Sequence, residues 1–171
     1  MSSVERSGEP TSVVTSFLLR QGQAGDEVLL VRRSQRVRTY QGAWAGVSGY
    51  LEAGVTPLEQ AYTELREEMG LDSGSVKLVK AGPPLLVEDE GHGLRWLVHP
   101  FLFSLQTGQD LRLDWEALEM RWVRPGELGS YDTVPMLAEA LAEVYPVVDM
   151  NPANPANPAN PAIEEDDHRH A

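Results

Sequence analysis

The chain has 171 residues, no cysteine, 14 Lys and Arg against 26 Asp and Glu, and a formal net charge of −12. The length fits one domain with a tail. The lack of cysteine excludes disulfide scaffolds, cysteine-based zinc sites and cysteine nucleophiles. The acidity disfavours binding to duplex nucleic acid, which needs clustered basic residues, and no apolar stretch is long enough to span a membrane. Since the N-terminus does not resemble a signal peptide, we expect a cytoplasmic protein.

Composition divides the chain into three parts. Residues 1–10 are polar and are predicted to be a flexible N-terminus. Residues 11–149 combine apolar runs with turn signals, as a folded domain does. Residues 151–171 open with four Asn-Pro-Ala triplets and are predicted to be a disordered tail, because they have almost no apolar side chain to bury. A partner-binding spacer, or a metal-binding pair of His168 and His170, is the alternative for this tail.

The folded part is predicted to be rich in strands. Two apolar, β-branched runs, Val13–Leu19 and Val28–Val31, predict a hairpin across a Gly-containing turn. A Gly-rich loop over 41–54 then leads into a predicted helix over Pro57–Met69. The later predicted elements are strands at Val76–Ala81, Leu85–Val87, Trp96–Leu105, Leu111–Leu113 and Glu119–Val123, and a closing helix at Val134–Tyr145. Strands at both ends with only two helices predict a mixed α/β sandwich.

The predicted helix over 57–69 has explicit signals at both ends. Thr56 can cap its start, with Glu59 three residues later to complete a capping box, and Pro57 suits the first turn. Gly70 suits the residue that follows the helix. Its apolar stripe consists of Leu58, Ala61, Tyr62, Leu65 and Met69.

Three glutamates, Glu64, Glu67 and Glu68, project from the other side of this helix, within about 100° of each other. Such pairs repel each other by about 0.2–0.5 kcal/mol on an exposed helix, and a bound cation would offset that cost. Mg²⁺ and Mn²⁺ prefer carboxylate oxygens, water and substrate phosphates. Taken alone, the helix favours a solvated acidic face, since Glu is a good helix former, and only the surrounding residues favour a cation site.

The segment from Gly49 to Leu71 resembles the Nudix box, whose family pattern is G-x5-E-x7-R-E-U-x-E-E-x-G-U, with U a bulky aliphatic residue. The matching positions are Gly49, Glu64, Leu65, Glu67, Glu68, Gly70 and Leu71. The preceding Gly42-Ala43-Trp44 also looks like a lead-in of that family. The resemblance covers residues 11–145. It implies a Nudix-like α/β/α sandwich with a mixed β-sheet and a catalytic helix after a Gly-rich loop.

Two positions of the box depart from the family pattern, because Val55 replaces its first Glu and Thr63 replaces its Arg. In the family this pair typically forms a salt bridge that orients the catalytic helix. Losing both members together leaves no stranded charge, and Glu52 or Arg66 is a candidate for a substitute brace. Two interpretations stay open: a divergent but catalytic Nudix hydrolase, or a Nudix-like domain that binds a nucleotide only as a sensor.

The resemblance implies metal-assisted attack of water on a pyrophosphate bond of a nucleoside diphosphate derivative. It implies Glu67 and Glu68 as the principal ligands of Mg²⁺ or Mn²⁺, and Glu64 as a further ligand or general base. The backbone carbonyl of Ser48 is a weaker candidate ligand. The general base varies within the family and can lie outside the box. The acids held in reserve for that role are Glu88, Asp89, Glu90, Asp114, Glu116 and Glu119.

Basic and aromatic side chains beside the Gly-rich loop are the candidates for substrate binding. They are Arg32, Arg33, Arg36 and Arg38, with Tyr40, Trp44 and Tyr50. The guanidinium groups suit phosphates, although charge balance for nearby glutamates is a competing role. The rings can stack on a base, although core packing is an equal alternative for Trp44. The expected partners are a small-molecule nucleoside diphosphate derivative and, by analogy with relatives, a second copy in a homodimer.

Overall fold

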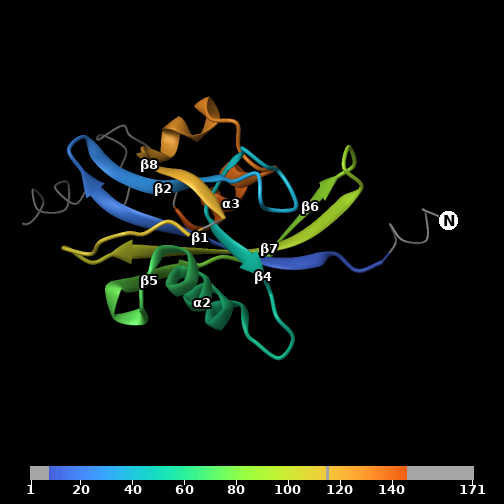
Figure 1. The fold of residues 1–171 in the computed structure, drawn as a ribbon, viewed down its shortest axis with the longest axis horizontal. Coiled ribbons are helices and arrows are strands. Elements are labelled where there is room, and N and C mark those ends of the chain that lie inside the picture. The colour runs from blue at the N-terminus through green and yellow to red at the C-terminus, as the bar shows by residue number, and fades with distance from the viewer. Residues whose placement is uncertain (1–7, 115, 146–171) are drawn as a thin grey trace, which may run out of the picture.

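The structure is a computed structural model that describes residues 8–114 and 116–145 (Figure 1). Most of the predicted flexible N-terminus and all of the predicted disordered tail lie outside the described residues. The strands are β1 (Thr11–Gly22), β2 (Gly25–Arg33), β3 (Trp44–Ala45), β4 (Val47–Tyr50), β5 (Val76–Ala81), β6 (Leu85–Asp89), β7 (Leu94–Leu105) and β8 (Ala117–Val123). The helices are α2 (Pro57–Met69) and α3 (Leu137–Val144), with 3₁₀ turns η1 (Ser73–Ser75) and η2 (Pro125–Ser130).

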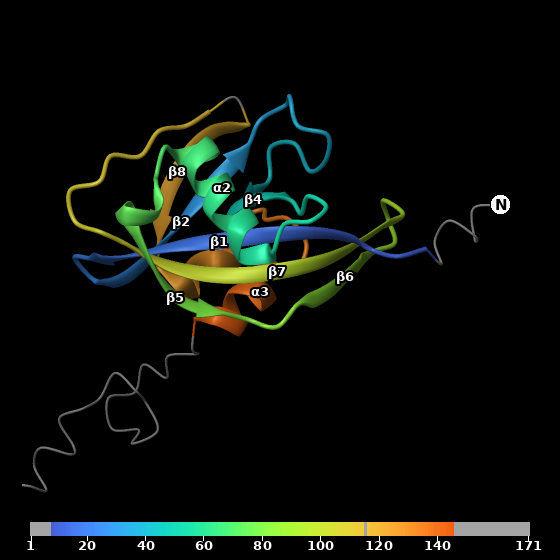
Figure 2. The same ribbon diagram turned by 90° about the horizontal axis from the view of Figure 1, so that it is seen from below.

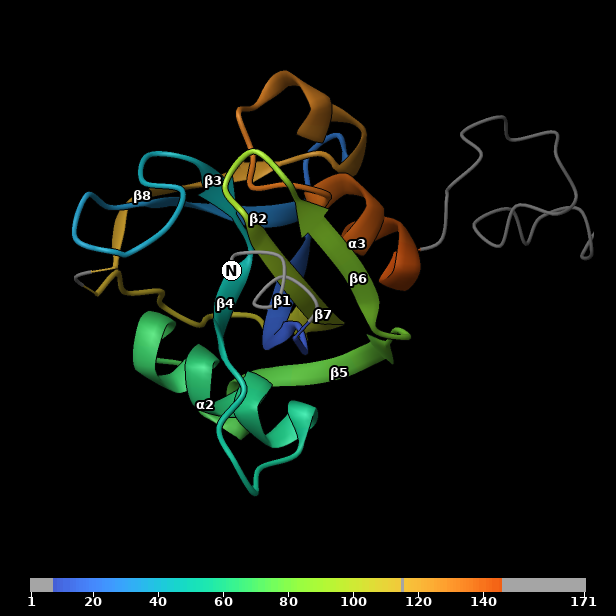
Figure 3. The ribbon, with the colours of Figure 1, turned by 90° about the vertical axis from the view of Figure 1, so that its right-hand side faces the viewer.

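All eight strands form one mixed sheet with β1 near its centre. β1 pairs in parallel with β7 and antiparallel with β2 and β4, while β5 and β6 pair with β7, and β8 pairs with β2. Figures 2 and 3 show α2 and α3 on opposite faces of this sheet. The structure therefore confirms the predicted α/β/α sandwich with a mixed sheet.

The two faces of the sheet carry separate hydrophobic clusters, because successive side chains of a strand point to opposite faces. On β1, Val14 and Leu18 belong to the cluster that contains Leu65 of α2. Between them, Phe17 belongs to the cluster that contains Leu141 of α3. Each helix is thus fixed to the sheet by burial of its own apolar stripe, worth about 1.5–3 kcal/mol for each large side chain that is fully buried.

Helix α2 begins and ends where the sequence predicts. Thr56 Oγ1 accepts a hydrogen bond from the Glu59 N–H at 3.2 Å, and Glu59 Oε1 accepts one from the Thr56 N–H at 3.0 Å, which completes the capping box. Gly70 adopts φ +73°, a left-handed conformation that favours glycine, and its N–H donates to the Arg66 carbonyl. The first and last residues of the acidic helix are therefore fixed by local contacts.

The predicted loop over 41–54 is wrong in part, since it contains both β3 and β4. Ala45 and Trp44 pair with Val31 and Arg32 of β2, whereas β4 pairs with β1. These strands are only two and four residues long, and long-range pairing rather than local propensity forms them. The pairing brings the start of the box against the central strand.

Two other predictions near the C-terminal end need correction. Residues 111–113 are irregular rather than a strand, and their Arg112 N–H donates to the Met69 carbonyl at the end of α2. The closing helix begins at Leu137 rather than at Val134, because the residue before a proline is pushed out of the helical region. The Val134 N–H instead donates to the Trp44 carbonyl. Among the described residues, every helix is too short or too polar to cross a membrane.

Candidate functional site

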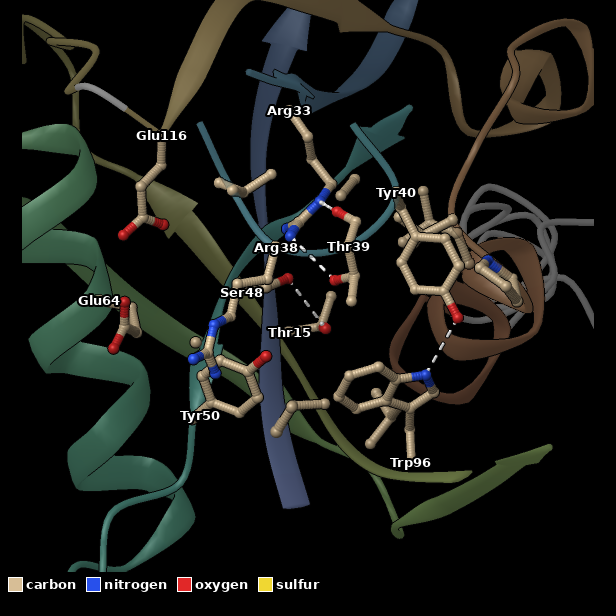
Figure 4. A pocket seen from close by; sticks show the side chains of 18 of the residues that line it. Thr15, Arg33, Arg38, Thr39, Tyr40, Ser48, Tyr50, Glu64, Trp96 and Glu116 are labelled. Carbon is tan, nitrogen blue, oxygen red and sulfur yellow. Dashed lines mark hydrogen bonds between the residues drawn. The ribbon is translucent and has the colours of Figure 1, made fainter. Parts of the chain in front are cut away.

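A cavity of about 570 Å³ opens beside α2, between the loop that follows β2 and the start of α3. Its charged and aromatic lining consists of Glu52, Glu64, Glu67 and Glu116, of Arg33, Arg36 and Arg38, and of Tyr40, Tyr50 and Trp96. Figure 4 shows Glu64 and Glu116 on one side of the cavity and Tyr40 and Trp96 on the other. One end of the cavity is therefore acidic, and the other is aromatic.

The helix places the predicted acids in two different environments. Glu64 and Glu68, four residues apart, are only 9% and 5% exposed, whereas Glu67 is exposed at the cavity rim. Burial raises the pKa of Glu64, and burial together with the neighbouring Glu64 raises the pKa of Glu68 well above the usual glutamate value. The two buried carboxyl groups lie next to each other, and this proximity adds to burial in raising the pKa of Glu68.

Glu116 is a third acid at the acidic end of the cavity, and Arg33 is a cation close to it. Glu116, which precedes β8, has a pKa raised first by burial and then by the nearby Asp114 and Glu64. The Arg33 guanidinium is anchored by the Thr39 carbonyl at 2.9 Å and by Thr39 Oγ1 at 3.3 Å. Burial lowers the pKa of Arg33, while attraction to Glu68 and Glu116 opposes that shift. We call Glu64, Glu68 and Glu116 the carboxylate cluster, and Arg33 is its nearby cation.

Glu64 is held in place by backbone as well as by side chains. It packs directly against Gly49 of β4, so closely that a Cβ at position 49 would overlap its carboxylate. The amide Nε2 of Gln60 donates to Glu64 Oε2 at 2.8 Å. The glycine of the box is therefore required here for a close approach of helix and strand.

Proton release from the carboxylate cluster should destabilise the cation-free protein. Because the pKa values of Glu64, Glu68 and Glu116 are raised, the native state keeps protons that the unfolded state releases above about pH 4.3. The free energy of unfolding in EDTA is therefore expected to fall as the pH rises through these raised pKa values. Urea denaturation over a pH series measures this slope.

The matched variant for that titration is Glu68→Gln, which removes the buried acid but keeps its volume. At neutral pH in EDTA we expect it to raise the free energy of unfolding by about 1–3 kcal/mol, because an amide does not pay the cost of ionising or protonating a buried carboxyl group. Its pH slope should also be shallower than that of the unsubstituted chain. Equal slopes would show that Glu68 is not the buried titrating group.

The donor set suits a hard divalent cation. Oε2 of Glu68 is buried and has no hydrogen-bond partner among the described residues, and the neighbouring donors are carboxylate oxygens, which Mg²⁺ and Mn²⁺ prefer. In the arrangement of residues 8–114 and 116–145, no three acidic or histidine side chains converge closely enough to hold a metal ion. Glu64 and Glu68 contact each other, while Glu67 faces outward.

The structure separates the other predicted site residues into two groups. Ser48, Tyr50, Arg33 and Arg38 line the cavity. The side chain of Ser48 is within 3.1 Å of Thr15 Oγ1, and this contact fixes β4 against β1 beside the acidic end.

Arg32 and Trp44 are outside the cavity lining. The Arg32 side chain donates to the Gly42 carbonyl and to Glu119 Oε1, each at 3.2 Å, so it ties β2 to β8. Trp44 is 8% exposed and packs edge-on against the Tyr131 ring at 5.6 Å between centroids. Cross-strand pairing therefore accounts for Arg32, and core packing accounts for Trp44.

Sequence reasoning missed Trp96 as a site residue. Its indole N–H donates to the Tyr40 hydroxyl at 3.1 Å, and that hydroxyl donates to Asp89 Oδ2 at 2.7 Å. Burial, together with this bond to Asp89, raises the pKa of Tyr40 to about 12. No local motif marks Trp96, since only the parallel pairing of β7 with β1 brings it to the cavity.

Comparison with known proteins gives one family and several similar structures. The model of the NUDIX domain matches residues 10–148. An Ap4A hydrolase of C. elegans, in a binary complex, aligns with a TM-score of 0.66 and 17% identity over 78% of this chain and 93% of that one. The Nudix hydrolase RenU of M. smegmatis aligns with a TM-score of 0.63 and 20% identity, over 77% and 80%.

A third similar structure is the NUDIX domain of Shewanella oneidensis NrtR, complexed with ADP ribose. It aligns with a TM-score of 0.61 and 13% identity, over 80% of this chain and 88% of that one. At such identities the likeness establishes the fold, whereas the family model covers most of the sequence itself.

Proposed function

The chain belongs to the NUDIX family of pyrophosphohydrolases, and on that premise we propose that it uses Mg²⁺ or Mn²⁺ to hydrolyse a pyrophosphate bond in a nucleoside diphosphate derivative. The observation that carries this proposal is that Glu64, backed by the buried Glu68, lines a cavity that also presents arginines and aromatic rings. A carboxylate cluster alone would repel a pyrophosphate, which explains why a cation is required.

We assign the cation to Glu64, Glu67 and Glu68, with the Ser48 carbonyl as a further ligand, which requires the exposed Glu67 side chain to turn towards the other two. When bound, the cation would offset the charge of the phosphates and acidify a water molecule. The unpartnered Glu68 Oε2 supports this assignment, because a cation would supply the interaction that this buried atom lacks.

The protein's own groups supply the other parts of the reaction. Arg33 and Arg38 line the cavity where they can bind the phosphates through planar guanidinium groups. Glu64 and Glu116 are the two candidates for the general base, since burial raises the pKa of each toward the range in which a carboxylate accepts protons effectively.

The aromatic end of the cavity is assigned to the base or another planar group of the substrate. Tyr50 and Trp96 lie with ring centroids 6.3 Å apart, and Tyr40 lies at the same distance from Trp96. Tyr50 is 49% exposed, so its ring face is open to a ligand. Stacking on such rings is worth about 1–3 kcal/mol per base where it has been measured with nucleic acids.

A panel of nucleoside diphosphate derivatives, with Mg²⁺ or Mn²⁺, tests this function. Ap4A and ADP-ribose begin the panel because one similar structure is an Ap4A hydrolase and another is a complex with ADP ribose. A nucleotide sugar and a nucleoside triphosphate complete it. We expect cation-dependent release of a nucleoside monophosphate from at least one compound. EDTA should stop the reaction, and product identification should assign the bond that breaks.

The same panel distinguishes the alternative, a catalytically weak domain that binds a nucleotide as a sensor. Calorimetric binding of a panel compound without turnover, even in Mn²⁺, would favour the sensor over the enzyme. If no panel compound were bound or hydrolysed, both the enzyme and the sensor hypotheses would be refuted. The homodimer and the cytoplasmic location inferred from the sequence stay predictions.

A further inference from the structure

Gln60 is a polar side chain that is almost completely buried. It lies on α2 one turn before Glu64 and is only 1% exposed, so its amide needs hydrogen-bond partners within the protein. Its Oε1 accepts from the backbone N–H of Glu52 at 3.1 Å, and its Nε2 donates to Glu64 Oε2 at 2.8 Å. One amide therefore connects the loop after β4 to a carboxylate of the cluster.

This connection spans the same segment of the box as the two positions that form a salt bridge in the family pattern. The box positions of that pair are occupied by Val55 and Thr63, which have no charge to pair. The side chains of Glu52 and Arg66, the substitute braces considered from the sequence, are both exposed. Only the backbone N–H of Glu52 takes part in the link, and the buried partner is Gln60.

We propose that Gln60 is a positioning residue that holds Glu64 in its working orientation, in place of the ion pair that this chain has lost. The proposal rests on the proposed function, because it concerns the orientation of an acid in that site. A neutral amide suits this position, since it binds Glu64 without adding a charge beside the buried Glu64–Glu68 pair. Both of its polar ends are used, so the loop and the carboxylate are held together.

The decisive variant is Gln60→Met, which keeps the length and volume of the side chain but removes both hydrogen bonds. We expect kcat on the best panel substrate to fall by about 10–100-fold, the range typical of groups that orient metal ligands. KM should change by less than about threefold, because Gln60 is not among the residues that line the cavity. The Mn²⁺ affinity of the substrate-free protein, measured by electron paramagnetic resonance, should fall by a similar factor.

Arg66→Met is the matched control, since it adds the same side chain at an exposed position of the same helix. It should keep the kcat and the Mn²⁺ affinity of the unsubstituted chain. Should Gln60→Met fail to fold by circular dichroism, Gln60→Asn serves instead, because it keeps the amide but is one methylene too short to reach both partners. Either variant of Gln60 is expected to show the same loss.

Rescue separates positioning from a general loss of stability. Adding Val55→Glu and Thr63→Arg to Gln60→Met reinstates the pair of the family pattern and is expected to recover most of the lost kcat. A folded Gln60→Met protein with the kcat and Mn²⁺ affinity of the unsubstituted chain would overturn the proposal. If the unsubstituted chain hydrolyses nothing, the proposed function fails, while the Mn²⁺ comparison still tests Gln60.

Discussion

Glu68→Gln is expected to lower kcat by about 10²–10⁴-fold, because losing a ligand of the cation would lose several kcal/mol of transition-state stabilisation. The amide fills the same volume and keeps a hydrogen-bonding group beside Glu64, so the helix should remain packed. It cannot carry the negative charge that a hard cation requires. Steady-state kinetics on the best panel substrate, at several Mg²⁺ and Mn²⁺ concentrations, measure the loss.

Glu139→Gln is the control for this charge change, because Glu139 is an exposed acid on the opposite helix α3. It should leave kcat and KM unchanged. If Glu68→Gln were as active as that control, the carboxylate cluster would not be the catalytic centre, and the assignment of the cation to Glu68 would be wrong.

Gly49→Ala is expected to lower kcat by at least about tenfold while the protein remains folded. The added methyl group would overlap the Glu64 carboxylate, which is the far end of a flexible side chain and can swing away. Swinging away relieves the overlap at small cost in stability but moves the acid from its place beside Glu68. Misplacing a catalytic group by about 1 Å can cost a hundredfold in rate.

Gly126→Ala is the matched control, because a Cβ at position 126 has no neighbour within 4 Å. Its kcat should equal that of the unsubstituted chain, and both variants should unfold within a few degrees of it in a thermal scan. A fully active Gly49→Ala protein would show that Glu64 does not need its present position. A crystal structure of the variant would then show where the carboxylate lies.

The sequence predicts α2 to the residue because its signals are local. Thr56 and Glu59 cap the helix start, and Gly70 ends it, whatever the rest of the chain does. The strands β3 and β4 have no such signal, since Gly-rich segments have low strand propensity and become strands only by pairing with β2 and β1. Residues 111–113 show the reverse case, because the alternating Leu-Arg-Leu pattern predicts a strand but the segment is irregular.

The candidate site also contains residues that local sequence predicts and residues that it does not. The positions of Glu64, Glu67 and Glu68 follow from helical spacing, and spacing also makes Glu64 and Glu68 neighbours. Burial does not follow from spacing, and it is burial that separates the paired Glu64 and Glu68 from the exposed Glu67. The groups that come from distant strands, above all Trp96, depend on sheet topology.

Gln60 illustrates a further limit of motif reasoning. Because Val55 and Thr63 cannot form the salt bridge of the family pattern, another contact has to replace it. The nearby charged side chains of Glu52 and Arg66 are the obvious candidates, but both are exposed. A neutral residue at an unspecified position of the box makes the contact instead. Hydrogen bonds of buried amides depend on which groups surround them in three dimensions, and that is not encoded in residue spacing.

The contacts of Tyr40 determine which hydrogen-bond donors the aromatic end of the cavity can present to a ligand. Its hydroxyl hydrogen is engaged by Asp89, and the indole hydrogen of Trp96 is engaged by Tyr40. The hydroxyl of Tyr40 and the indole N–H of Trp96 are therefore not available as hydrogen-bond donors to a ligand. A planar group that entered there would meet the faces of these rings and would be held by stacking rather than by hydrogen bonds from Tyr40 or Trp96.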